Sequence, residues 1–151
     1  MSPHAALTSL RSLSARIGRD TLLTQANSGN TSIKLGRVLW VKASGKWLSD
    51  ALQEDIFARV DLASARECIR TGHNPAAAAR DADGEKLIPS VETAMHAVLP
   101  HPVVVHVHSV NTIAHAVRWD ARPHLERLLA GLQWEWIPYA ASGLPLAATL
   151  I

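Results

Sequence analysis

The sequence predicts an α/β domain with three layers, in which a mostly antiparallel sheet lies between helices. Three observations support this fold class. The chain has 151 residues, enough for one hydrophobic core. Hydrophobic residues make up 48% and charged residues 19%, a composition typical of globular proteins and not of disordered ones. Helical and strand-like segments follow one another in a mixed order, which indicates a layered domain with a largely antiparallel sheet.

A helix and a hairpin are predicted at the start of the chain. Over the first 19 residues the apolar side chains recur on one side of a helix. They are Leu7, Leu10, Leu13 and Ile17. The same segment has arginines, serines and no acid, as a transit peptide does, but its pattern runs directly into the next structured segment and favours the helix. Residues 33–35 and 38–41 are then predicted as two strands joined at Gly36.

The middle of the chain predicts a strand, a short helix, a loop and a second helix. Residues 56–62 have the composition of a strand, and residues 63–70 that of a short helix. Residues 71–86 are rich in Gly, Asn, Asp and Ala, which indicates a mobile surface loop. A helix is expected within residues 89–100, with Ser90 as its N-cap.

The last third predicts a central strand, two helices, a further strand and the start of a helix. The valine-rich residues 103–109 are predicted as the central strand of the sheet. Residues 110–119 and 123–132 have helical patterns. Residues 134–140 are expected to return as a strand, and a helix begins within residues 144–151.

The composition also argues against several classes of protein. No apolar run approaches the roughly 20 residues that a membrane helix needs. The net charge is only +2 and the basic residues are scattered, so no nucleic-acid partner is expected. The single cysteine, Cys68, cannot form an internal disulfide, which is typical of a reducing compartment. No hydrophobic signal peptide is present, and a cytoplasmic location is therefore expected.

Two histidines on the predicted central strand suggest a metal site. His106 and His108 are two residues apart, so both point to the same face of the strand, while Val105 and Val107 are expected to face its packed side. Their Cα atoms are expected roughly 6.6 Å apart. That spacing lets two imidazoles bind one zinc ion at about 2.0–2.1 Å. Taken alone, the pair favours an ordinary structural role by about two to one.

Further residues strengthen the metal-site interpretation. Glu92 lies at the start of the helix that leads into the histidine strand, where it could act as a general base. An acid in the first turn of a helix is also stabilised by the helix dipole and needs no function. Two glycine loops and a serine offer N–H groups and hydroxyls to an oxyanion or phosphate. These candidate binding residues are Gly29, Asn30, Ser44, Gly45 and Ser90.

Four segments, in their order and spacing, resemble the class II aldolase/adducin family. The segments are "SGNTSIK", "ASGKWLSDA", "PSVETAMH" and "VVVHVHS". This family includes fuculose-phosphate and rhamnulose-phosphate aldolases and the ribulose-phosphate 4-epimerase. The resemblance extends from about Leu7 to the last residue. Within the family, "PSVET" and "GKWLSDA" look closer to the rhamnulose-phosphate branch and to aldolase domains fused to dehydrogenases. Because aldolases, epimerases and decarboxylases share the scaffold, the reaction type is an inference at the level of the family.

The resemblance implies a role for each candidate residue. It implies the family's three-layer α/β/α fold, with His106 and His108 as two zinc ligands and Glu92 as the acid that moves a proton on carbon. The phosphate of the substrate would bind at the five loop residues, of which Asn30 would also touch the reacting oxygens. The implied reaction is retro-aldol cleavage of a ketose 1-phosphate, with zinc polarising the carbonyl. Family members are typically tetramers, so a homo-oligomer is implied.

The sequence departs from the family pattern at three points, one of which is that the tyrosine acid of some members has no clear counterpart, since the only tyrosine is Tyr139. The family's third zinc ligand is a histidine in a His-Gly turn, which would fall beyond Ile151; residues 1–151 are therefore expected to form a single domain without that ligand. Val91 occupies the position of a second phosphate-binding serine. These departures leave an alternative open. The chain could be a catalytically inactive, adducin-like domain for oligomerisation or interaction, so whether it is an enzyme stays undecided.

Overall fold

The computed structural model describes residues 2–75, 79–80 and 87–151. Its helices are α1 (Pro3–Gly18), α2 (Leu62–Arg70), α3 (Thr93–Val98), α4 (Val110–Ala116), α5 (Ala121–Leu128) and α6 (Leu144–Ala148). Its strands are β1 (Asn30–Leu35), β2 (Val38–Lys42), β3 (Phe57–Asp61), β4 (Ala79–Arg80) and β5 (Val103–His106), with a 3-10 turn, η1, at Leu48–Asp50.

The strands form one antiparallel sheet in the order β4-β3-β2-β1-β5. β1 and β2 form the predicted hairpin, and its turn contains Gly36 at a φ of 58°. Glycine suits this position because it adopts a positive φ without steric cost. β5 returns to pair with β1, and Asn30 lies directly opposite His106. This pairing joins one end of the hairpin to the histidine segment.

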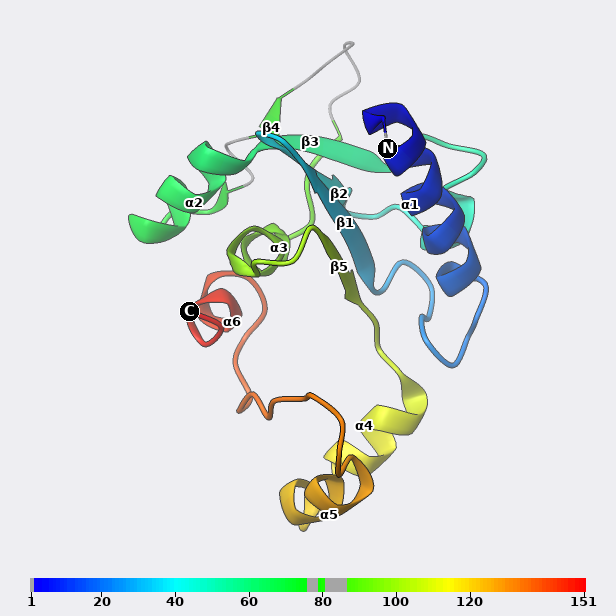
Figure 1. Cartoon of the computed structure of the whole chain (residues 1–151), viewed down its shortest axis with the longest axis vertical. Helices are drawn as coiled ribbons and strands as arrows, with labels where there is room; N and C mark the ends of the chain where they lie inside the picture. The colour runs from blue at the N-terminus through cyan, green and yellow to red at the C-terminus, as the bar shows by residue number, and fades with distance from the viewer. Residues whose placement is uncertain (1, 76–78, 81–86) are drawn as a thin grey trace.

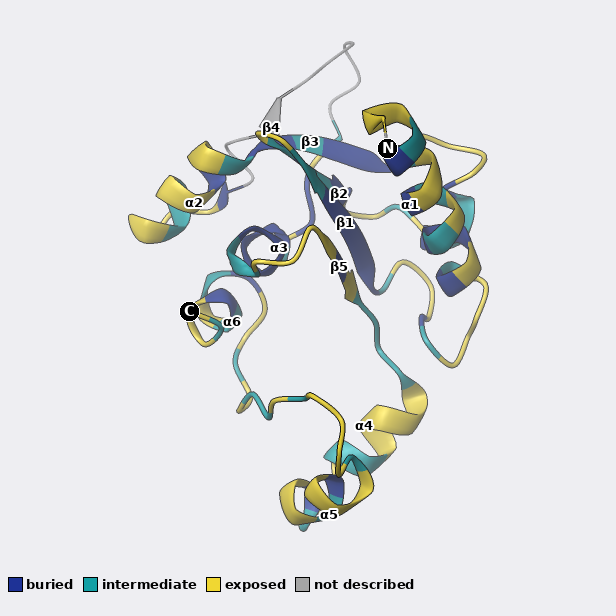
Figure 2. Cartoon of the chain, in the orientation of Figure 1, coloured by how far each residue is buried: buried dark blue, intermediate teal, exposed yellow. Residues whose placement is uncertain are grey.

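Helices cover both faces of the sheet, which confirms the predicted three-layer α/β/α arrangement (Figure 1). On one face, Ile33 of β1 and Phe57 of β3 pack into a buried cluster with α1. On the other face, Leu39 and Val41 of β2 pack into a second cluster with residues from α2 and α3. Successive strand residues point to opposite faces, so both clusters arise from the same strands. The sheet is accordingly buried at its centre (Figure 2).

Helix α1 is held at both of its ends. At its start, the Ser2 side chain accepts a hydrogen bond from the backbone N–H of Ala5, as an N-cap does. At its end, Gly18 lies directly against η1: a Cβ added there would be 2.1 Å from the backbone nitrogen of Ser49. The close approach of α1 to η1 therefore depends on a glycine at this position.

The prediction that residues 103–109 form the central strand is wrong in two respects. The strand ends at His106, and β5 is the edge strand of the described sheet, bonded to β1 alone. Val105 lies opposite Thr31, on the face that α1 covers, but it is 43% exposed because β5 lies beyond the helix. An apolar run does not reveal the position of a strand within a sheet. Val107 is partly buried against the cluster around α1.

Other predicted elements differ from the structure more locally. Residues 134–140 form no strand, because no described strand lies beside them to complete a ladder, and Tyr139 is 97% exposed. The helix predicted from Ser90 begins at Thr93, with Glu92 at the N-cap position. Ser90 closes the preceding turn, since its carbonyl accepts from the backbone N–H of Thr93. Within the predicted 71–86 loop, residues 76–78 and 81–86 lie outside the described residues, whereas residues 71–75 follow α2 and residues 79–80 form the short β4.

Helices α4 and α5 form a hairpin that extends away from the sheet (Figure 1). α4 has no buried residue, and a contact between the rings of His115 and His124 joins the two helices. None of the described helices combines the length and the apolar character that crossing a bilayer requires.

Candidate functional site

Four of the predicted site residues meet at one end of the β1–β2 hairpin. Asn30 begins β1, His106 ends β5 beside it, and Glu92 immediately precedes α3. The Asn30 Nδ2 atom lies 2.7 Å from Glu92 Oε2 and 3.2 Å from the Ser90 hydroxyl. The same Glu92 oxygen lies 2.8 Å from His106 Nδ1. The fold therefore holds a carboxylate between an amide and an imidazole.

The surroundings of Glu92 keep it ionised. Its side chain is only 14% exposed, and burial alone would raise its pKa. Hydrogen bonds from His106 and Asn30, with the charge of His106, outweigh burial and lower the pKa of Glu92 to about 2. A carboxylate with so low a pKa accepts a proton poorly while both donors hold it. Proton transfer to Glu92 therefore requires that one of these hydrogen bonds loosen.

The two histidines at the end of β5 have an arrangement that suits a shared metal ion. The ring centroids of His106 and His108 are 4.9 Å apart and the rings are tilted by 56°. Two imidazoles bound tetrahedrally to one zinc ion would have centroids about 5 Å apart. When His106 is neutral and donates its Nδ1–H to the carboxylate of Glu92, the Nε2 lone pair of the ring is left for a metal.

The pair supplies only part of a metal site. Within the part of the chain that the structure describes, no three histidine, cysteine, aspartate or glutamate side chains are grouped to hold a metal ion. His106 and His108 are close enough that they could supply two ligands to a divalent ion, with the tautomer of a neutral His106 set by Glu92. A third ligand is not grouped with them among residues 2–75, 79–80 and 87–151.

The predicted phosphate loops border the same cluster. Gly29 has a φ of 68°, and a Cβ there would be 2.9 Å from the carbonyl oxygen of His106. On the other side, the backbone N–H of Ser44 donates to the carbonyl of Ile88 at 2.7 Å, which brings this loop beside the Ser90 segment. Gly45 follows in open space with a φ of 76°.

Lys42 joins the two glycine loops, and the sequence analysis did not identify it. Its ammonium group donates to the carbonyl of Asn27 at 2.7 Å and to that of Lys46 at 2.6 Å. Lys42 is 2% exposed, and burial lowers its pKa to about 8, although the charge of Glu92 acts in the opposite direction. The sequence offered one indication of its role, which is a charged residue at the end of an otherwise apolar strand.

His96 and Ser32 also belong to the cluster; His96 was expected near the site, outside the set of reacting and binding residues, and Ser32 was not predicted as a site residue. His96 Nδ1 lies 2.7 Å from the Ser32 hydroxyl, and its Nε2 contacts the Asn30 side-chain oxygen. The spacing of these residues in the sequence predicts that they lie near Glu92 and Asn30. Glu92 and His96 are one helical turn apart, while Asn30 and Ser32 alternate onto one face of β1.

Acidification is expected to destabilise the fold through His96. Burial, followed by the charge of His106, lowers the pKa of His96 from 6.5 to about 3. Between these values the unfolded chain binds a proton that the folded chain does not. The stabilising contribution is therefore full above pH 6.5 and is lost as the pH falls toward 3. From pH 7 to pH 5 the free energy of unfolding should fall by about 2 kcal/mol through this residue.

Urea denaturation at both pH values measures this loss. His96→Gln should lack about 2 kcal/mol of the wild-type difference between pH 7 and pH 5. His101→Gln, at an exposed position, should keep it. Equal pH dependence in the wild type and His96→Gln would show that His96 ionises in the folded state.

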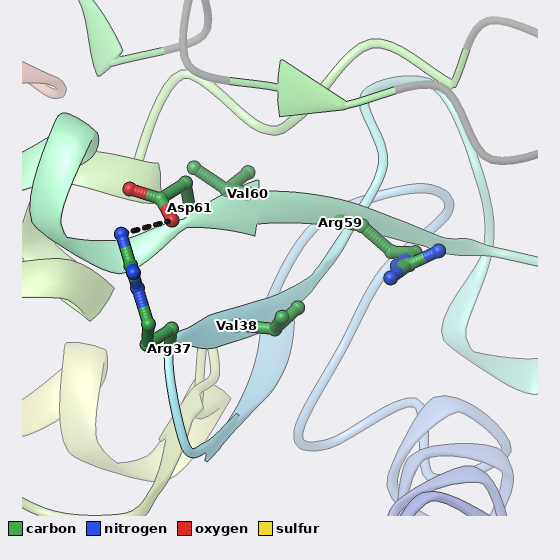
Figure 3. Close-up of a pocket in the computed structure, with 5 residues that line it drawn as sticks. All are labelled: Arg37, Val38, Arg59, Val60 and Asp61. Atoms are coloured by element: carbon green, nitrogen blue, oxygen red, sulfur yellow. Dashed lines mark ion pairs between the residues drawn. The ribbon is translucent and has the colours of Figure 1, made fainter.

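A cavity of about 410 Å³ lies at the opposite end of the hairpin and shares no residue with this cluster. It is lined by Arg37, Val38, Arg59, Val60 and Asp61 (Figure 3). Arg37 and Asp61 approach to 3.8 Å, while the guanidinium of Arg59 lies over the ring of Trp40 at 5.1 Å. Figure 3 shows the two arginines extending in different directions, so they do not converge on one point.

This chain belongs to the class II aldolase and adducin N-terminal domain family, whose model matches residues 10–151. Proteins of this family generally use a divalent metal ion, bind sugar phosphates and often form oligomers. The resemblance found in the four sequence segments is thereby confirmed.

A curated relative is similar to most of this chain. YuxG of Bacillus subtilis strain 168, named an uncharacterised oxidoreductase, is 30% identical over 146 residues. The alignment covers 87% of this chain and 21% of YuxG, so the chain spans about a fifth of that relative.

Two solved structures share the fold. The N-terminal class II aldolase domain of a conserved protein from Thermoplasma acidophilum is 25% identical, with a TM-score of 0.75 over 91% of this chain and 70% of that one. YgbL from Klebsiella pneumoniae, a candidate aldolase, epimerase or decarboxylase, is 20% identical, with a TM-score of 0.50 over 75% of this chain and 50% of that one.

Proposed function

We propose that this chain is the catalytic domain of a zinc-dependent lyase that cleaves a ketose 1-phosphate by a retro-aldol reaction. The main support is the carboxylate of Glu92, which is hydrogen-bonded to both Asn30 and His106 in a cluster bordered by two glycine loops. Membership of the class II aldolase family supports the reaction class. We further propose that the protein acts in the cytoplasm, that its substrate is a sugar phosphate and that it forms a homo-oligomer.

Each residue of the cluster has a separate part in the proposed reaction. A divalent ion bound by His106 and His108 would supply a Lewis acid for the substrate carbonyl. The phosphate would bind to backbone N–H groups and hydroxyls of the loop residues, and Asn30 would also touch the reacting oxygens. The loop residues are Gly29, Asn30, Ser44, Gly45 and Ser90. The bond between C3 and C4 would break as the C4 hydroxyl passes its proton to the carboxylate of Glu92, which can accept it once one of its hydrogen bonds loosens. Glu92 would deliver a proton to C3, which completes dihydroxyacetone phosphate and releases an aldehyde.

Zinc binding to the histidine pair is the first testable part of this proposal. We expect the 151-residue chain to bind Zn²⁺ in isothermal titration, and His106→Gln to bind it at least tenfold more weakly, because one of two grouped imidazoles is lost. His101→Gln removes an exposed imidazole elsewhere and should bind like the wild type. Equal zinc affinity in His106→Gln and the wild type would contradict the assigned site.

Release of dihydroxyacetone phosphate tests the proposed function itself. The chain, loaded with zinc, is incubated with rhamnulose 1-phosphate and fuculose 1-phosphate, and the product is reduced enzymatically with NADH. Product formation that requires zinc supports the lyase. Zinc binding without any product from either ester would favour the alternative, a family member that keeps the fold for interaction only.

A further inference from the structure

A buried chain of hydrogen bonds leads from β1 through α3 to the carboxylate of Glu92. His96 is fully buried, at 0% exposure, between two polar partners. Its Nδ1 lies 2.7 Å from the Ser32 hydroxyl, and its Nε2 contacts the side-chain oxygen of Asn30. The Asn30 nitrogen continues to Glu92 Oε2 at 2.7 Å. Ser32, His96, Asn30 and Glu92 are therefore linked end to end.

Elementary hydrogen-bond chemistry gives this chain a direction. An ionised carboxylate only accepts, so the atom of Asn30 that faces Glu92 must be the NH₂ group. The oxygen of the same amide then faces His96 and also only accepts. Nε2 of His96 must therefore carry the ring proton, and Nδ1 must accept from the hydroxyl of Ser32. Only one neutral tautomer of His96 satisfies every bond.

We infer that His96, set by Ser32, is a positioning residue that fixes the orientation of the Asn30 amide and so keeps an N–H donor on the Glu92 carboxylate. An inverted amide would bring its oxygen against the carboxylate, which is repulsive, and would leave the His96 proton facing an NH₂ group. The catalytic meaning of this role rests on the proposed function. The tautomer and the amide orientation rest on the geometry alone.

Replacement of His96 by glutamine or by asparagine distinguishes a positioning role from a packing role, because the two amide side chains differ in length. The nitrogen of glutamine at position 96 can replace Nε2 and donate to Asn30. The shorter asparagine reaches only the Nδ1 position, next to Ser32, and leaves Asn30 without its donor. Both replacements are polar amides in the same buried position. If His96 only filled space, His96→Asn and His96→Gln would differ in stability. Their catalytic activity would then change only in proportion to the fraction of protein that is folded.

Exchange of the C3 proton of dihydroxyacetone phosphate with D₂O, followed by proton NMR, isolates the step assigned to Glu92. In the zinc-loaded chain we expect His96→Asn to lower the exchange kcat by about 10–100-fold with little change in KM, and His96→Gln to recover most of it. Ser32→Ala should also lower kcat, because Nδ1 loses the donor that fixes the tautomer. Equal kcat in His96→Asn and His96→Gln, after correction for folded fraction, would overturn the inference.

The ¹⁵N chemical shifts of the His96 ring test the inference without any enzymatic activity. In the wild-type chain Nε2 should have the shift of a protonated nitrogen and Nδ1 that of an unprotonated one, and Ser32→Ala should produce a mixture of tautomers. A proton on Nδ1 in the wild type would overturn the inference even in an active protein and even if the variants do not fold. Absence of C3 exchange in the wild type would instead count against the proposed function, with the ring shifts still deciding the role of His96.

Discussion

Glu92→Gln is expected to reduce dihydroxyacetone phosphate release by about 10²–10⁴-fold, because the amide cannot take up or deliver a proton as a carboxylate does. The glutamine keeps the size of the side chain and an oxygen that can accept from Asn30 and His106. The phosphate loops are unchanged, so KM should change little. Steady-state kinetics with zinc-loaded protein, with the reaction coupled to NADH oxidation, measures both parameters.

Glu67→Gln provides the matched control for this substitution. Glu67 lies on α2 in an exposed ion pair with Arg70, outside the cluster, and its loss should leave kcat unchanged. Zinc affinity of Glu92→Gln must be measured in parallel, since Glu92 bonds a proposed ligand. If Glu92→Gln binds zinc and retains the wild-type kcat, another group moves the proton and the proposed mechanism is wrong.

Gly18→Ala is expected to lower the free energy of unfolding by about 3 kcal/mol or more, because overpacking against backbone cannot be relieved by rotating a side chain. The added methyl group would lie 2.1 Å from Ser49 N and 2.5 Å from the carbonyl carbon of Leu48. Either α1 must move away from η1 or the turn must shift, and both break contacts within the buried cluster around α1. Urea denaturation followed by circular dichroism measures the change.

Gly36→Ala separates crowding from backbone preference. Gly36 has a positive φ, but a Cβ there meets nothing within 4 Å, so the expected cost is only about 1–2 kcal/mol of conformational strain. A loss in Gly18→Ala that is no larger than in Gly36→Ala would show that α1 and η1 adjust their spacing easily.

The layers of the fold could be predicted from the sequence, whereas the order of the strands could not. Apolar periodicity reports which side of an element is buried, and it located α1, the hairpin and β3. Whether a strand has one neighbour or two depends on pairing between distant segments. β5 was therefore expected at the centre of the sheet and lies at its edge. Residues 134–140 have strand-like composition but no described partner, and they form no ladder.

Much of the candidate site was available from the sequence because its residues occur in short, recognisable motifs. Asn30, Glu92 and His106 were each singled out, and the structure joins them by hydrogen bonds. The motifs did not reveal Lys42, and they placed His96 near the site without showing what it contacts. Lys42 and His96 act through contacts with backbone or side chains from other elements, and those contacts exist only after the sheet and α3 have assembled.

The place of His106 at the last rung of β5 has a consequence for how the protein loses function. Asn30 and His106 are neighbours in the same ladder, and among the described residues no strand pairs with the outer side of β5. Fraying of this terminal rung would separate the imidazole from the carboxylate while the core beneath α1 stays intact. Mild heating or low denaturant should therefore inactivate the protein before its helices melt, and hydrogen exchange at this rung should report the same opening.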